Sequence, residues 1–201
     1  MTWEIRLLPL RELQLYASIP IVFDVSSVLE VRPVKGGLGG LQLEEVALKT
    51  SYQKDYDNIG GLETGPLTWA LEFDMNNWGI FVAFEHDVPI GGAMVAFNTA
   101  GVNMLEGRRD LAVLWDLRVH PEHRGKGIGH ALFQTAAEWS KARECRKLKI
   151  ETQNTNVPAC HFYQRQGCTL GSVHRFGYDA YSAVSHEAML LWYKDLTFET
   201  E

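Results

Sequence analysis

The stretch from Leu117 to Gly129, LRVHPEHRGKGIG, decides how this chain is interpreted. Upstream of it, residues 111–119 alternate in a way that predicts a β-strand. Downstream of it, apolar residues recur at helical spacing from Ile128 to Trp139. The sequence therefore predicts a strand, a glycine-rich loop and an amphipathic helix, in that order.

The loop itself has the features of a phosphate site. Its alternating glycines permit positive φ angles and let the main chain approach a ligand closely. The unpaired N–H groups and the dipole of the following helix N-terminus favour an anion. Arg124 and Lys126 add positive charge. We predict a pyrophosphate cradle, with a connector that binds no ligand as the alternative. A dinucleotide fingerprint would need glycine where the chain has His130.

Outward from this segment, strands alternate with helices, which predicts an α/β (α+β) chain dominated by its sheet. A hairpin is predicted near residues 27–34 and 41–48. Its glycine-rich turn, residues 35–40, lacks the Lys-Ser/Thr ending of a P-loop. We expect one domain over residues 1–201. The other predicted strands are 2–8, 79–84, 89–97, 111–119, 147–151, 169–175 and 188–194, and the predicted helices are 10–18, 66–75, 128–139 and 156–166.

Composition narrows the functional classes. A formal charge of −6 argues against a nucleic-acid partner, which needs a basic face. The odd number of cysteines, Cys145, Cys160 and Cys168, and the lack of a C-x-x-C pattern favour buried free thiols over disulfides or structural zinc. No signal peptide is visible and no apolar stretch reaches the ~18 residues that span a bilayer, so we expect a cytoplasmic protein without a membrane partner.

Two motifs resemble those of the GCN5-related N-acetyltransferase (GNAT) family. Residues 124–129, RGKGIG, resemble its acetyl-CoA signature, R/Q-x-x-G-x-G/A. Residues 156–163, NVPACHFY, resemble its second motif, N-x-x-A-x-x-F-Y, which normally ends in Gly-Phe but here ends in Gly167-Cys168. The resemblance covers the whole chain loosely and residues 111–171 closely. Residues 115–125, 151–159 and, more weakly, 31–57 are similar to streptothricin acetyltransferases.

The resemblance implies acetyl transfer from acetyl-CoA, without a metal, to a primary amine of a small molecule such as streptothricin. Another small amine, such as a polyamine or an amino-sugar, and a non-catalytic CoA-binding module are the alternatives. The implied fold is a mixed, mostly antiparallel sheet of seven strands, with strands four and five parallel and splayed, and the family permits a homodimer. The implied cofactor-binding residues are Leu117, Arg118, Val119, Arg124, Gly125, Lys126, Gly127, Ile128, Gly129, Asn156 and Tyr163.

Catalysis requires that a cationic amine lose its proton before it attacks the thioester. Asp116 alternates with Trp115 and Leu117 on its strand, so we expect it on the opposite face and assign it as the base. An ion pair with Arg118 is the structural alternative, and Glu151 or a chain of waters are the other candidate bases.

The resemblance also implies roles for two further groups. Tyr163 is the general acid that protonates the leaving thiolate, and backbone N–H groups around residues 118–119 stabilise the oxyanion. Asn156 is expected both to cap its helix and to contact the cofactor. His120 and His123 lack a third ligand of matching spacing, so we expect loop histidines without a metal. The aromatic side chains Trp69, Phe73, Trp78 and Phe81 are expected in the core, with one or two lining an acceptor pocket within residues 10–80.

Overall fold

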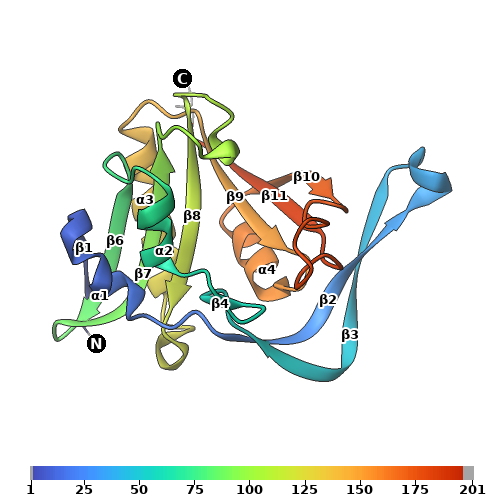
Figure 1. The fold of residues 1–201 in the computed structure, drawn as a ribbon, viewed down its shortest axis with the longest axis horizontal. Coiled ribbons are helices and arrows are strands. Elements are labelled where there is room, and N and C mark those ends of the chain that lie inside the picture. The colour runs from blue at the N-terminus through green and yellow to red at the C-terminus, as the bar shows by residue number, and fades with distance from the viewer. Residues whose placement is uncertain (1, 197–201) are drawn as a thin grey trace. The chain divides into compact units, whose positions relative to one another are not determined.

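The structure, a computed structural model, describes residues 2–196. The predicted order of strands and helices is confirmed, apart from two short strands within residues 58–63 (Figure 1). The strands are β1 (Glu4–Leu7), β2 (Phe23–Pro33), β3 (Leu41–Lys54), β4 (Asn58–Ile59), β5 (Leu62–Glu63), β6 (Gly79–Glu85), β7 (Val88–Phe97), β8 (Leu111–Val119), β9 (Lys147–Gln153), β10 (Thr169–His174) and β11 (Met189–Asp195). The helices are α1 (Leu13–Ala17), α2 (Pro66–Glu72), α3 (Ile128–Lys141) and α4 (Val157–Arg165).

The predicted mixed sheet of seven strands is confirmed, and its strand order is β1-β6-β7-β8-β9-β11-β10. The pairs β1–β6, β6–β7, β7–β8 and β10–β11 are antiparallel, whereas β8 and β9 are parallel. The parallel ladder starts at Leu111 and Lys147 and ends at Leu114 and Ile150. β8 therefore continues to Val119 beyond its last pair with β9.

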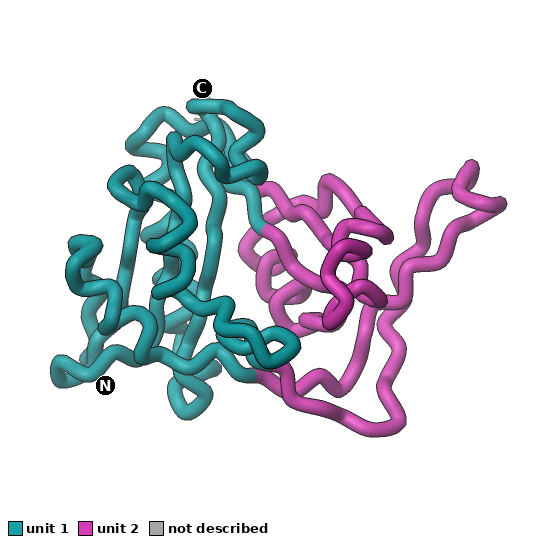
Figure 2. Tube along the Cα trace, in the orientation of Figure 1, with its two compact units in different colours: residues 1–22, 55–150, 194–201 teal, residues 23–54, 151–193 magenta. Residues whose placement is uncertain are grey.

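The chain divides into two compact units (Figure 2). The first comprises residues 1–22, 55–150 and 194–201, and the second comprises residues 23–54 and 151–193. Each unit is assembled from segments that are distant in the sequence. The expected single domain over residues 1–201 stays a prediction.

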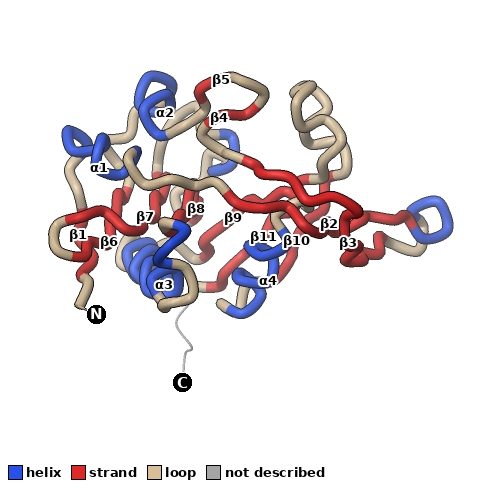
Figure 3. Tube along the Cα trace, turned by 90° about the horizontal axis from the view of Figure 1, so that it is seen from below, coloured by secondary structure: helices blue, strands red, loops and turns tan. Residues whose placement is uncertain are grey.

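In the first unit, helices cover both faces of the strands (Figure 3). α1 and α2 lie on one face of β6 and β7, and α3 lies on the other. β6 and β7 are buried over nearly their whole length, which explains their continuous apolar sequence. Ile80, Val82 and Met94 pack with Tyr16 of α1, whereas Gly91 allows Ile128 of α3 to come close on the opposite face.

In the second unit, β2 and β3 form a hairpin that pairs from Phe23 and Lys54 to Pro33 and Leu41, longer than predicted at its open end. α4 begins as its sequence predicts. Oδ1 of Asn156 accepts a hydrogen bond from the N–H of Ala159 at 3.2 Å, which caps the helix. Gly167 follows the helix with a φ of +74°.

Two local features differ from the predictions. α2 ends at Glu72 instead of continuing to residue 75, because Phe73 is already extended. The small hairpin of β4 and β5 was not predicted, although Gly60 and Gly61, both with positive φ, are a typical two-residue hairpin turn.

The three cysteines are buried and free, which confirms the predicted thiols. Within residues 2–196, every helix is too short or too polar to cross a membrane.

Candidate active site

β8 contains a β-bulge at Trp115, directly before the candidate base Asp116. Val95 of β7 pairs with Leu114, and the preceding Met94 pairs with Asp116, so Trp115 is an extra residue. The bulge turns Asp116 and Arg118 toward α1, the face on which Trp115 also packs. The prediction that Asp116 lies on the face opposite Trp115 is therefore wrong, because simple alternation does not hold across a bulge.

The end of β8 presents backbone groups at the edge away from β7. The N–H of His120 donates to the carbonyl of Ile90 on β7 at 2.9 Å. Because N–H groups alternate between the two edges of an antiparallel strand, those of Leu117 and Val119 point away from β7. Of the two predicted oxyanion donors, Val119 thus has its N–H on that edge, while the N–H of Arg118 points to β7.

The glycine-rich loop has the backbone conformation that its sequence predicts. Gly125 and Gly127 have φ angles of +76° and +83°, and a Cβ on either would meet no atom within 4 Å. Gly127 is the N-cap of α3, and its cap position has no side-chain hydrogen bond. The first N–H groups of a helix have no intrahelical partner. The start of α3 therefore has no side-chain cap, and the two glycines leave space beside the loop, an arrangement suited to an anion.

The side chains of this loop have separate roles. Arg124 donates from Nε to the carbonyl of Val119 at 3.1 Å and from Nη2 to the carbonyl of Val22 at 2.7 Å. It thereby ties the loop to the end of β8. Lys126 is exposed, Gly129 lies in the first turn of α3, and Ile128 is buried and anchors the helix.

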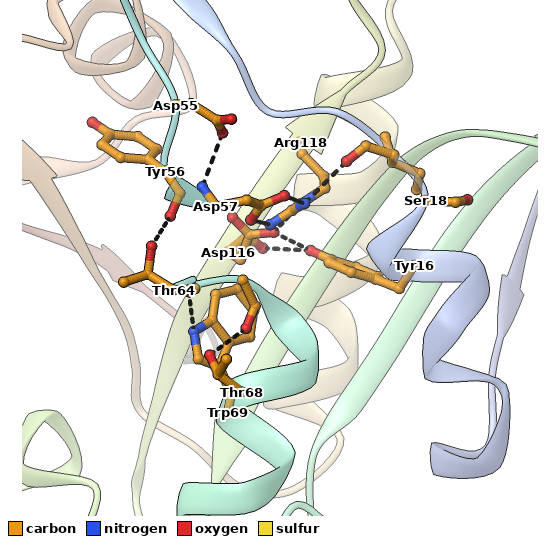
Figure 4. A network of polar contacts seen from close by, with 12 residues as sticks. Tyr16, Ser18, Asp55, Tyr56, Asp57, Thr64, Thr68, Trp69, Asp116 and Arg118 are labelled. Atoms are coloured by element: carbon orange, nitrogen blue, oxygen red, sulfur yellow. Dashed lines mark hydrogen bonds and ion pairs between the residues drawn. The ribbon is translucent and has the colours of Figure 1, made fainter. Parts of the chain in front are cut away.

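Beside the bulge, a buried guanidinium joins two carboxylates (Figure 4). The side chain of Arg118 is fully buried. It donates to Oδ2 of Asp116 at 2.6 Å and, through two nitrogens, to both carboxylate oxygens of Asp57 at 2.8 and 3.0 Å. It also donates to the carbonyl of Ile19 at 3.0 Å, and Tyr16 donates its hydroxyl to Oδ2 of Asp116 at 2.6 Å. We call Tyr16, Asp57, Asp116 and Arg118 the Arg118 network.

The protonation states in the network follow from its environment. Burial, and next the charge of Asp116, raise the pKa of Tyr16 well above 10, so the phenol stays a donor. Burial opposes the charged form of Arg118, but Asp116, Tyr16 and Asp57 outweigh this effect and raise its pKa. The network therefore combines one permanent cation with two carboxylates.

Aromatic side chains surround the bulge. The ring of Trp115 lies 6.1 Å from that of Trp69, 5.4 Å from that of Phe73 and 5.3 Å from that of Trp78. Trp78 belongs to the buried core, as does Phe81, whereas Trp69 and Phe73 pack partly buried against it. The expected core role is thus confirmed for Trp78 and Phe81, and the expectation that one or two of these rings line an acceptor pocket stays a prediction.

The remaining predicted residues belong to the second unit. Tyr163 on α4 is buried, with its ring centroid 5.2 Å from that of Phe162. Glu151 accepts a hydrogen bond from the hydroxyl of Tyr178 at 2.5 Å through Oε1. Asn156 caps α4, so its amide oxygen has the predicted structural role. Among the described residues 2–196, no group of three or more metal-ligand side chains occurs.

Sequence reasoning missed Asp57 and Tyr16. Asp57 ends the segment Lys54-Asp55-Tyr56-Asp57, and Tyr16 lies on the predicted helix 10–18, but neither belongs to a GNAT motif. Their partner Arg118 is far away in the sequence, so only the fold brings them together.

Comparison with known proteins identifies the family. The model of the acetyltransferase (GNAT) family matches residues 46–168. A streptothricin acetyltransferase from Escherichia coli is 40% identical over 110 residues, which are 54% of this chain and 63% of that enzyme. One from Streptomyces lavendulae is 32% identical over 145 residues, which are 72% of this chain and 70% of that enzyme.

A solved structure supports the same assignment. It is that of a Bacillus anthracis protein assigned as a streptothricin acetyltransferase, in complex with acetyl coenzyme A. It is 25% identical and aligns with a TM-score of 0.73 over 97% of this chain and 98% of its own. The E. coli relative is matched over less than two thirds of its length. From the family match and the shared fold, we conclude that this chain belongs to the GNAT family of acetyltransferases.

Proposed function

We propose that the chain transfers the acetyl group of acetyl-CoA to a primary amine of a small molecule, with streptothricin as the acceptor. The observation that carries this proposal is the loop of uncapped amides at the start of α3, next to the edge of β8 that carries the N–H groups of Leu117 and Val119. The streptothricin acetyltransferases among its relatives support the choice of acceptor.

The residues of the loop and strand fit acetyl-CoA. The amides of residues 125–129 would hold its diphosphate, because glycines with positive φ leave the approach open. Leu117 and Val119 would bind its pantetheine arm through their backbone, as an added strand would. Arg124 would keep the loop against β8, and Lys126 would add charge toward the phosphates. Asn156 and Tyr163 complete the proposed cofactor residues.

Bound acetyl-CoA supplies the thioester that donates the acetyl group. The amine nitrogen forms the new bond to the carbonyl carbon as the bond from carbon to sulfur breaks. The N–H of Val119 would stabilise the negative charge on the carbonyl oxygen. Tyr163 would protonate the departing sulfur, and Asp116 would hold the ammonium group and accept or relay its proton. Tyr16 and Arg118 both donate to Oδ2 of Asp116, so Oδ1 is the oxygen we assign to the acceptor.

A thiol-release assay with acetyl-CoA tests the function. We expect CoA release with streptothricin. CoA release only with spermidine or glucosamine would mean that another amine is the acceptor, while the proposed acetyl transfer would stand. CoA binding without turnover of any amine would contradict the proposal that the chain is an enzyme. The chain would then be a non-catalytic CoA-binding module. We also expect a homodimer, which sedimentation equilibrium can test.

The assigned acid can be tested by a single variant. Tyr163→Phe should lower kcat about 100-fold, the size of a typical general-acid contribution, with little change in the KM of acetyl-CoA. Tyr52→Phe, which changes an exposed tyrosine of the same unit, is the matched control. Equal activity of the two variants would remove Tyr163 from the mechanism.

A further inference from the structure

We propose that Asp57, held by Arg118 next to Asp116, is the residue that selects a cationic acceptor by supplying its countercharge. This inference rests on the proposed function, because it names the charge of the acceptor of the same site. It assigns a role to Asp57, which lies outside both GNAT motifs, at the end of the stretch 31–57 that weakly resembles streptothricin acetyltransferases. The acceptor class is an amine that carries positive charge at neutral pH, and streptothricin is the probe.

The first support is the gradient of exposure through the Arg118 network. The side chain of Arg118 is 0% exposed, that of Asp116 is 8% exposed and that of Asp57 is 26% exposed. Asp57 is therefore the member of the network most accessible to a molecule that arrives from solvent. Both of its oxygens bond to the guanidinium, which fixes the carboxylate plane.

The second support is a charge that the network does not neutralise. Two carboxylates and one guanidinium carry a formal charge of −1. Tyr16 cannot offset this charge, because its phenol is neutral at physiological pH. An excess negative charge in a partly desolvated place favours binding of a cation. An incoming ammonium group would make the cluster neutral.

The third support is how the chain holds Asp57 in place. The N–H of Asp57 donates to Oδ1 of Asp55 at 3.0 Å, and its carbonyl accepts from the N–H of Thr64 at 3.0 Å. A Cβ at Gly65 would lie 3.1 Å from Oδ1 of Asp57, so glycine leaves room for the carboxylate there. The two backbone hydrogen bonds thus fix the position of Asp57, and Gly65 leaves space for its carboxylate.

The fourth support is the aromatic surroundings. Trp115 precedes Asp116 directly and contacts Trp69, whose indole N–H donates to the carbonyl of Thr64 at 2.8 Å (Figure 4). Tryptophan faces attract cations, and both rings are only partly buried. An indole ring beside the carboxylates would add cation–π attraction for an ammonium group.

Binding of streptothricin to the protein without acetyl-CoA tests this inference, with tryptophan fluorescence and calorimetry as readouts. Asp57→Asn keeps the shape and removes the charge, and we expect about tenfold weaker binding. The matched control is Asp110→Asn, which breaks another two-bond pair, with Arg108 at 2.9 and 3.0 Å, and should leave binding unchanged. In turnover, Asp57→Asn should raise the acceptor KM about tenfold, while kcat and the KM of acetyl-CoA stay within about twofold.

The outcomes separate this inference from the proposed function. If the wild type acetylates streptothricin and Asp57→Asn binds it equally well, the selecting role of Asp57 is overturned and the function stands. If the wild type acetylates no amine but binds streptothricin through Asp57, the function fails and the cation site stands. A purely structural role would lower the melting temperature and weaken acetyl-CoA binding together. Should Asp57→Asn not fold, streptothricin binding by the wild type must still weaken with added salt, and salt-independent binding would contradict the inference.

Discussion

The Arg118 network of the first unit and the pair of Lys54 and Glu187 in the second are both buried charge clusters, but they differ in balance. Nζ of Lys54 lies 2.5 Å from each carboxylate oxygen of Glu187 and 3.3 Å from the hydroxyl of Thr155. The side chains of Lys54 and Glu187 are 9% and 2% exposed, and their charges cancel. In contrast, the Arg118 network has two carboxylates for one guanidinium and a partly exposed member. The pair of Lys54 and Glu187 is neutral and buried, so it needs no further counterion. The Arg118 network has an excess negative charge and a partly exposed carboxylate, so it is suited to a cationic ligand.

The largest expected effect is loss of the guanidinium. Arg118→Met leaves two carboxylates close together without their cation, and we expect a loss of roughly 3–5 kcal/mol in the free energy of unfolding. Urea denaturation measures it. The control is Arg108→Met, which removes a half-exposed pair with Asp110 and should cost less than about 1 kcal/mol. Similar losses in both variants would show that the burial of Arg118 has no energetic consequence.

The closed pair should respond differently to single and double changes. Lys54→Met leaves the carboxylate of Glu187 buried without a counterion and should cost about 3 kcal/mol. Lys54→Met combined with Glu187→Leu should recover most of that loss, because no charge then remains buried. Streptothricin binding by the folded double variant should equal that of the wild type. Weaker binding would mean that the balanced pair also serves the acceptor.

Alkaline pH provides a test of the Tyr16 contact. The folded pKa of Tyr16 lies above its unfolded value near 10, so the stability that it contributes is fully present below pH 10. Above pH 10 the unfolded chain releases this proton while the folded chain retains it. The free energy of unfolding of the wild type should therefore fall by about 1.4 kcal/mol per pH unit relative to Tyr16→Phe, until the folded pKa is reached. Denaturation curves at several alkaline pH values measure the difference, and parallel pH profiles would contradict it.

The smallest expected effect concerns two glycines with the same backbone angle. Gly127 in the loop before α3 and Gly101 in a surface turn both have a φ of +83° and open space at the Cβ position. Alanine at either should cost about 1 kcal/mol of stability, because an L side chain disfavours this conformation. Only Gly127→Ala should also raise the Kd of acetyl-CoA, by about tenfold. If Gly101→Ala raises the Kd of acetyl-CoA as much, the loop before α3 has no special role in cofactor binding.

Much of the fold could be predicted because its determinants are local. Apolar periodicity indicates α3, a continuous apolar run indicates β7, and the Asn156 cap and Gly167 mark the two ends of α4. The bulge at Trp115 could not be predicted, because an apolar residue at that position also fits an uninterrupted strand. Asp57 and Tyr16 were missed for another reason. Their roles depend on contacts with β8, and no local pattern encodes contacts between distant segments.

The bulge in β8 has a consequence for how this strand can vary. Before it, Val113 contributes to the apolar layer beneath α1, and after it Asp116 and Arg118 occupy that same side. Pairing of Trp115 as an ordinary strand residue would rotate the rest of the strand by one step and send both charges toward the apolar face of α3, whereas deletion of Trp115 would leave both charges on the side of α1. We therefore expect related chains to lose the bulge only together with the residue that forms it.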